Sequence, residues 1–121
     1  CMENILRTQI DLFRAPVIIC FGAKAFKRVI KKEHGVKDGT EILDSAGKYV
    51  ALEHPDYPLT LVIGIDSTQD LLGIERTLVH ELSHAVTQIM EYFGVVCDET
   101  RSYMLDYLYG ASIEWLRKVA K

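Results

Sequence analysis

Apolar residues recur along the chain with two different periods, and the period distinguishes strands from helices. The runs Ala15–Phe21 and Leu59–Ile65 are apolar and rich in β-branched residues, and Lys48–Glu53 alternates between polar and apolar residues. All three patterns predict strands. Because the last two strands flank a turn that contains Pro55 and Pro58, we expect them to pair as an antiparallel hairpin.

Three other segments have apolar residues spaced three and four apart, which predicts helices over Ala23–Glu33, Leu71–Phe93 and about Glu99–Val119. Residues 2–13 mix apolar and charged residues, and we interpret them as a short helix or an irregular lead-in.

Side chains that commonly cap helices precede two of these segments. Asp66, Ser67 and Thr68 offer caps for the second helix, and Asp98 offers one for the third. Gly110 lies inside the third helix, where glycine is unfavourable, so we expect it to mark a close helix–helix crossing.

The 121 residues suffice for one domain with one core, and we expect residues 1–121 to form it. The composition is 49% apolar and 26% charged, which is ordinary for a globular protein. The predicted fold class is α+β, a small mixed sheet whose antiparallel hairpin packs against the helices.

Net charge limits the classes of partner. The formal net charge is −3, so no basic field favours nucleic acid or anionic lipid. The basic residues of Ala23–Glu33 could form a nucleic-acid patch, but no aromatic residues interleave with them, which favours a solvated helix face. Apolar runs are too short to span a membrane, and no secretory signal is visible. Three cysteines without such a signal indicate a reducing compartment, so we expect a cytoplasmic protein.

Candidate chemistry lies in the Leu71–Phe93 helix, where His80, Glu81 and His84 form the H-E-x-x-H pattern. Residues four apart on a helix share one face, so the two imidazoles can bind one metal ion. Glu81 lies beside such an ion, where a general base can take a proton from metal-bound water. The sequence therefore predicts Zn²⁺ as cofactor, His80 and His84 as ligands and Glu81 as catalytic base.

The alternative is a solvated helix face that happens to carry two histidines. Apolar residues on both flanks of the motif leave only a narrow polar seam, which is typical of a central, buried helix. These residues are Leu78, Leu82, Ala85, Ile89 and Phe93 on one flank and Val79, Val86 and Met90 on the other.

Catalytic zinc usually takes a third protein ligand. No histidine follows His84, and Met90 occupies the place of the third histidine of metzincins, which excludes that family. A downstream carboxylate fits better, and Glu99 follows His84 by 15 residues (99 − 84 = 15). Asp98 and Cys97 remain alternatives, although Asp98 is also the natural cap of the last helix.

The residues from His80 to Thr87 resemble the zinc helix of thermolysin-like peptidases, the gluzincins. The order of elements over most of the chain resembles the small zincin-like proteins of phages and prophages. In that family the last helix opens with a Glu and a Tyr four residues on, as Glu99 and Tyr103 do here. The resemblance implies a minimal zincin-like fold, with Glu99 as third ligand ahead of Asp98 and Cys97. It also implies that a phage-encoded protein would act in the host cytoplasm.

Two further side chains on the last helix are candidates for the site. Tyr103 lies one turn from Glu99 and could donate to a developing oxyanion, although a core tyrosine is an equal alternative. Asp106 could orient a ligand histidine through its free N–H, or it could be an ordinary surface charge.

We therefore predict a zinc-dependent metallopeptidase that acts on a peptide or protein substrate. The strand Lys48–Glu53 is expected to hold that substrate by strand addition. A protein partner could supply specificity, since a domain of this size has no second domain to form the other wall of a substrate-binding cleft. The alternatives are a catalytically silent, zinc-bearing binding or inhibitory module of phage origin, and a metal that only stabilises a small fold.

Overall fold

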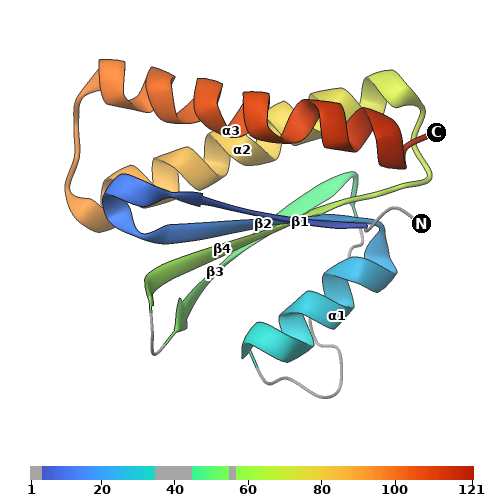
Figure 1. The fold of residues 1–121 in the computed structure, drawn as a ribbon, viewed down its shortest axis with the longest axis horizontal. Coiled ribbons are helices and arrows are strands. Elements are labelled where there is room, and N and C mark those ends of the chain that lie inside the picture. The colour runs from blue at the N-terminus through green and yellow to red at the C-terminus, as the bar shows by residue number, and fades with distance from the viewer. Residues whose placement is uncertain (1–3, 35–44, 55–56) are drawn as a thin grey trace.

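A computed structural model describes residues 4–34, 45–54 and 57–121, and its elements form an α+β fold (Figure 1). The described elements, in chain order, are β1 (Ile5–Ile10), the 3₁₀ turn η1 (Asp11–Phe13), β2 (Ala15–Phe21), α1 (Ala23–His34), β3 (Gly47–His54), β4 (Tyr57–Ile65), α2 (Leu71–Phe93) and α3 (Asp98–Val119).

The four strands form one mixed sheet in the order β1-β2-β4-β3. The central strands β2 and β4 run parallel, whereas β1 pairs antiparallel with β2 and β3 pairs antiparallel with β4. The predicted strands and the predicted antiparallel hairpin are therefore confirmed. Residues 35–44, between α1 and β3, lie outside the described residues.

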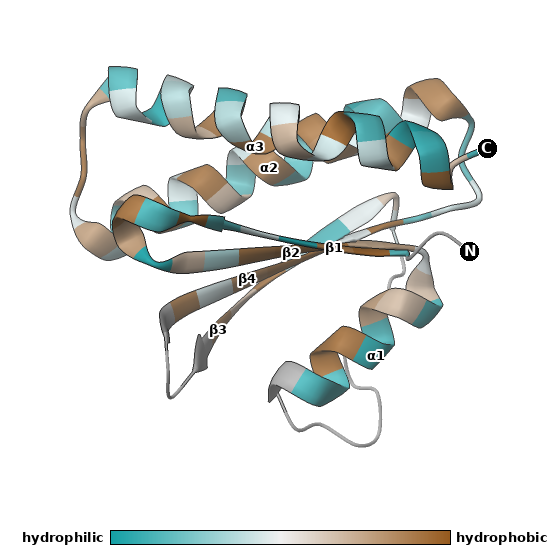
Figure 2. Cartoon of the chain, in the orientation of Figure 1, coloured by the Kyte–Doolittle hydropathy of each residue, from teal (hydrophilic) through white to brown (hydrophobic). Residues whose placement is uncertain are grey.

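Helices cover both faces of the sheet, with α2 and α3 on one face and α1 on the other (Figure 1). Because both faces are covered, the central strands carry apolar residues at successive positions rather than at alternate ones. Figure 2 shows β2 and β4 hydrophobic along most of their length, while hydrophilic residues recur along α1 and α3.

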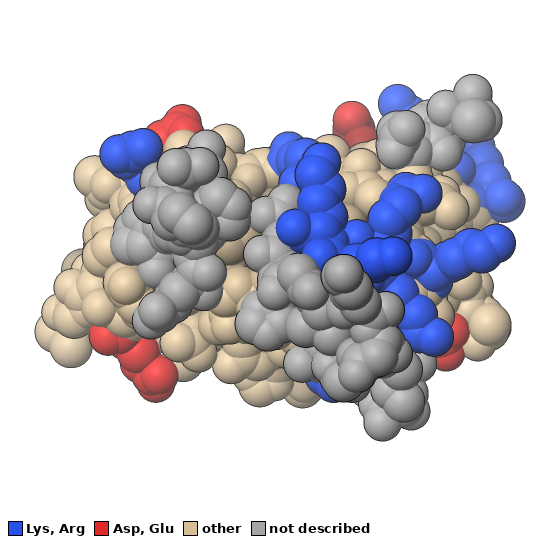
Figure 3. Space-filling view, turned by 90° about the horizontal axis from the view of Figure 1, so that it is seen from below, with Lys and Arg blue, Asp and Glu red and all other residues tan. Residues whose placement is uncertain are grey.

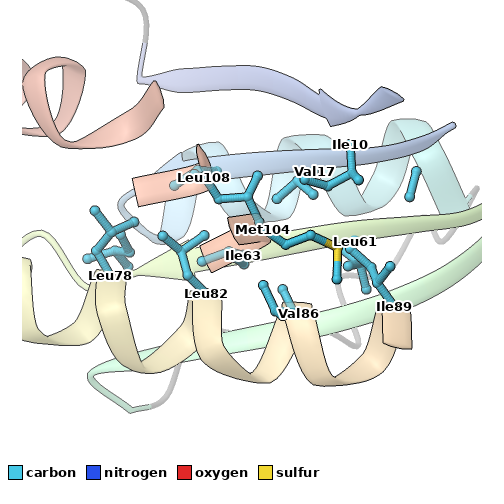
Figure 4. Packing of buried hydrophobic residues seen from close by; sticks show 14 of the residues in the cluster. Ile10, Val17, Leu61, Ile63, Leu78, Leu82, Val86, Ile89, Met104 and Leu108 are labelled. Atoms are coloured by element: carbon cyan, nitrogen blue, oxygen red, sulfur yellow. The ribbon is translucent and has the colours of Figure 1, made fainter. Parts of the chain in front are cut away.

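The larger core lies between the sheet and the α2–α3 pair (Figure 4). The side chains of α2 and α3 meet one face of β2 and β4 there, so burial of α2 depends on the paired central strands. The residues labelled in Figure 4 are Ile10, Val17, Leu61, Ile63, Leu78, Leu82, Val86, Ile89, Met104 and Leu108.

A smaller core lies between the sheet and α1. Phe26 of α1 packs directly on Gly64 of β4, where an added Cβ would lie only 2.6 Å from its ring, so this position requires glycine. Cys20 is buried here as expected, and burial raises the pKa of its thiol to about 12.

The outer face of α1 carries exposed basic residues, and Figure 3 shows Lys and Arg side chains gathered on that face of the molecule. It is the face opposite to α2 and α3, so this positive surface is separated from the H-E-x-x-H motif by the sheet. The exposed basic residues of α1 are Lys24, Lys27, Arg28, Lys31 and Lys32.

The predicted bounds of α2 are confirmed, but its cap is different. Asp70 caps the helix by accepting a 2.8 Å hydrogen bond from the Gly73 N–H, whereas the Asp66 carboxylate is engaged by Thr68. The helix ends at Gly94, whose φ of 70° lies in the left-handed region that favours glycine. Cys97 rather than Asp98 occupies the N-cap position of α3, because helical geometry already begins at Asp98.

Two other expectations are wrong. Residues Ile5–Ile10 form β1 rather than a short helix or an irregular lead-in, since pairing with β2 overrides a weak local pattern. Gly110 marks no close crossing, because no atom of another described element lies within 4 Å of the position that a Cβ would take. None of the described helices is both long enough and apolar enough to cross a membrane.

Candidate metal centre

His80 and His84 lie one turn apart on α2 and point toward each other. Their Nε2 atoms are 3.1 Å apart, and the rings meet edge-on with centroids 4.7 Å apart. Both residues are exposed, and the side chain of His80 is 68% accessible. The two histidines of the polar seam are therefore open to solvent, whereas Thr77 and Glu81 of the same seam are buried, as are most residues of the flanks.

The separation of the two nitrogens matches the geometry of zinc. Two imidazole nitrogens bound at 2.0–2.1 Å to one tetrahedral ion are about 3.3 Å apart. The observed 3.1 Å is close to this value, and neutral imidazole nitrogen is an ordinary zinc donor. The spacing of the two nitrogens is therefore that of two protein ligands of one zinc ion.

Glu81 is the third residue of the motif that the structure brings to this place. Its carboxylate Oε2 lies 4.0 Å from His80 Nε2, and the residue is only 6% exposed. Burial raises the pKa of its carboxyl group, and the nearby His80 and His84 oppose this shift. Glu81 is thus a partly desolvated carboxyl group beside the histidine pair.

The beginning of β3 passes very close to Glu81. A Cβ added at Gly47 would lie 2.4 Å from Thr77 Cγ2 and 3.2 Å from Glu81 Oε2. Only glycine fits between the strand and the helix here, so the backbone of β3 forms the wall against which the Glu81 carboxylate rests.

Tyr49 of β3 supports the second histidine. Its ring stacks on His84, with centroids 5.5 Å apart and an interplanar angle of 15°. The Tyr49 hydroxyl also donates a 3.3 Å hydrogen bond to Gln88 Oε1, one turn further along α2. These two contacts restrict the orientation of the His84 ring.

The predicted third ligand is not assembled with this pair. Among the residues that the structure describes, no three His, Cys, Asp or Glu side chains form a group that could hold a metal ion. Glu99, Asp98 and Cys97 are all exposed at the start of α3. The backbone N–H of Thr100, followed by its hydroxyl, lowers the pKa of the Cys97 thiol.

Arg101 is the residue that the first turns of α3 present to α2. Its guanidinium donates a 2.8 Å hydrogen bond to Ser83 Oγ and a shorter one to Thr87 Oγ1. Both hydroxyls lie on the side of α2 next to the histidines, so Arg101 attaches α3 beside the candidate site.

Tyr103 and Asp106 lie apart from the motif. Tyr103 is 68% exposed, which excludes a core role, and it lines a hollow formed by η1 and α3. Asp106 is exposed, and among the described residues it forms no hydrogen bond with His80 or His84. An oxyanion role for Tyr103 or an orienting role for Asp106 would require α3 to be placed differently.

A cavity of about 500 Å³ opens beside His80 and Glu81 and extends toward the N-terminal half of α2. Its walls come from the segment before β3, from the residue preceding the α2 cap, and from the first turns of α2. The lining residues are Ser45, Ala46, Gly47, Gln69, Gly73, Arg76, Thr77, His80 and Glu81.

Sequence reasoning missed Tyr49, Gly47 and Arg101. A signal for Arg101 existed, since Ser83 and Thr87 place two hydroxyls one turn apart beside the histidines. A guanidinium group can donate hydrogen bonds to both. No comparable signal marked Tyr49 or Gly47, because their roles depend on how β3 crosses α2.

Comparison of the chain with protein-family models, with curated proteins and with solved structures found no match. Any functional assignment therefore depends on the chemistry of the residues described above.

Proposed function

We propose that this protein is a zinc-dependent metallopeptidase of the small zincin-like type, acting on a peptide or protein substrate in the cytoplasm. The observation that carries the proposal is the pair of imidazole nitrogens 3.1 Å apart beside the buried Glu81 carboxyl group. A structural metal site would need the two histidines but not an acid at this place, whereas hydrolysis needs all three.

Zinc bound by His80, His84 and a third ligand would supply a water of lowered pKa and polarise the scissile carbonyl. We propose Glu99 as that third ligand, which requires the start of α3 to move toward the histidine pair. Glu81 would accept the proton of that water and pass it to the leaving amine. Its burial against β3 supports this role, because the strand holds the carboxyl group beside the histidine pair.

The sheet supplies a binding edge for an extended substrate. β3 is the last strand in the order β1-β2-β4-β3, so its outer edge pairs with no other described strand. Gly47, at the start of this edge, lies against Glu81. A peptide added antiparallel or parallel to β3 would pass the histidine pair with its backbone hydrogen-bonded to the strand.

Glu81→Gln tests the proposal, because glutamine keeps the size and polarity of the side chain but accepts no proton. Elemental analysis should find about one zinc per chain in both the wild type and the variant. In a peptide library analysed by mass spectrometry, turnover should fall by roughly 10²–10⁴-fold in the variant. Glu91→Gln, at an exposed position of the same helix, should retain full turnover.

A second candidate, a zinc-bearing binding or inhibitory module, is favoured by the 68% exposure of His80 and by the lack of an assembled third ligand among the described residues. It predicts that zinc binds but that no peptide is cut. It also predicts that Glu81→Gln preserves the biological role in cells. That combined result would replace the peptidase proposal.

A further inference from the structure

The cavity beside His80 and Glu81 contains one charged side chain that the proposed chemistry does not use, Arg76. Arg76 lies on α2 one turn before His80, so the two side chains are neighbours on the same helix face. The cavity is lined by His80 but not by His84, and therefore it extends to one side of the histidine pair.

Gln69, Thr77 and Ser45, which are other polar residues of the cavity wall, form hydrogen bonds within the wall. The Gln69 amide donates to the carbonyl oxygens of Ala46 and Asp66, at 3.1 and 2.9 Å, and accepts from the Thr77 hydroxyl at 3.2 Å. Ser45 donates a 2.7 Å hydrogen bond to the Gly47 carbonyl. These bonds fix the wall and leave few groups free to recognise a ligand.

Arg76 is different, because no hydrogen bond or ion pair joins it to any residue that the structure describes. The nearest acid in the sequence, Glu75, is held on another side of α2 by Arg117, with an N···O distance of 2.7 Å. The helix positions three and four residues from Arg76 hold Leu72, Gly73, Val79 and His80, none of which is a carboxylate.

The Arg76 guanidinium makes this end of the cavity electropositive. A planar fork of donors in this place is suited to a carboxylate, which it can bind with two parallel hydrogen bonds.

We infer that Arg76 is a specificity-determining residue that binds a carboxylate of the substrate, on the side of the scissile bond that lies over the N-terminal half of α2. This inference rests on the proposed peptidase function. The carboxylate can come from an Asp or Glu side chain near the scissile bond or from the C-terminus of a short peptide, and the two sources need separate tests.

The cleavage test compares matched peptides with the zinc-loaded wild type. Peptides with blocked ends carry Glu or Gln at one varied position, and a second pair carries a free or an amidated C-terminus. In one of the two pairs, the peptide with the carboxylate should have a kcat/KM roughly 10–100-fold higher than that of its neutral analogue. The pair that shows this preference identifies the source of the carboxylate.

Arg76→Ala should remove the preference, and Arg76→Glu should reverse it in favour of Lys or Arg at the same position. Arg28→Glu is the matched control, because it makes the same charge change at an exposed position of α1 on the opposite face of the sheet. A preference for acidic peptides that survives Arg76→Glu, or hydrolysis with no acidic preference, overturns the inference and leaves the peptidase proposal intact.

A binding test keeps the inference falsifiable even where no peptide is cut. Amide NMR spectra of metal-free protein are recorded with the blocked Glu peptide and with its Gln analogue. We expect the Glu peptide, but not its Gln analogue, to shift the Gly47 and Gly73 resonances. We expect Arg76→Ala to abolish these shifts. Equal shifts from both peptides, or from neither, overturn the role of Arg76. Failure to cut any peptide while the Arg76-dependent shifts persist counts against the peptidase proposal only.

Discussion

The Tyr49 ring stacks on the His84 ring, with centroids 5.5 Å apart and the planes inclined by 15°. This contact joins the edge strand β3 to the histidine pair. A side chain that orients a metal-binding histidine contributes to metal affinity even though it does not touch the metal.

Tyr49→Ala should therefore weaken zinc binding by about 10-fold, near the low end of the effects seen when supporting residues are removed. Tyr49→Phe keeps the ring and loses only the hydrogen bond to Gln88, so its zinc affinity should stay close to that of the wild type. Competition with a coloured chelator measures both. Equal losses in the two variants would show that the hydroxyl, not the stacked ring, supports the site.

The third ligand is tested by three single substitutions at the start of α3. We expect Glu99→Ala to lower zinc affinity far more than Asp98→Ala or Cys97→Ala, because the resemblance to gluzincin-like proteins assigns the ligand to Glu99. The same chelator competition applies. A loss confined to Cys97→Ala would contradict the gluzincin-like proposal. Unchanged affinity in all three variants would mean that α3 supplies no ligand.

Gly47→Ala should destabilise the protein, because the new Cβ would press on Thr77 and on the Glu81 side chain. Inserting a methyl group into a packed contact typically costs about 1–3 kcal/mol. Gly110→Ala is the matched comparison, since its Cβ meets nothing within 4 Å. It should stabilise α3 by roughly 1 kcal/mol through helix propensity. Urea denaturation of the two variants measures both effects, and equal signs would contradict the packing argument.

Cys97 and Cys20 should differ strongly in reactivity in a Cys1→Ser background. The thiolate is the reactive form of cysteine. The pKa of the exposed Cys97 thiol is lowered, so its alkylation should reach half its maximal rate at a lower pH than a free thiol does. Cys20 is buried with a pKa of about 12, so it should react only when the protein unfolds. Iodoacetamide labelling followed by peptide mass spectrometry distinguishes the two, and prompt labelling of Cys20 at neutral pH would contradict its burial.

Much of the fold was predictable, because strong local patterns and their tertiary surroundings agree. The Leu71–Phe93 stripe and the two apolar strands Ala15–Phe21 and Leu59–Ile65 are examples, since each run is apolar where the fold buries it. Residues Ile5–Ile10 were misread because their strand form depends on pairing with β2, which no local pattern encodes.

The candidate site was predictable only as far as one helix determines it. The spacing of His80, Glu81 and His84 fixes their proximity once α2 forms. The residues contributed by other elements could not be ranked in the same way, because a rotation of α3 about its axis decides which side chain faces α2. The sequence favoured Glu99 for that place, and in the structure Arg101 makes the contacts with α2.

The parallel pairing of β2 with β4 also has a consequence for how the chain folds. The outer strands join the central ones by short connections, as Ile10↔Ala15 and His54↔Tyr57 show, whereas the pair Val17↔Leu61 is separated by 44 residues (61 − 17 = 44). Closing that long loop is the slow step expected for such a topology. The apolar side of α2 has no complete surface to pack on until it closes, so the histidine pair should be among the last features to form. A ligand held by that pair would then slow unfolding while leaving the folding rate unchanged.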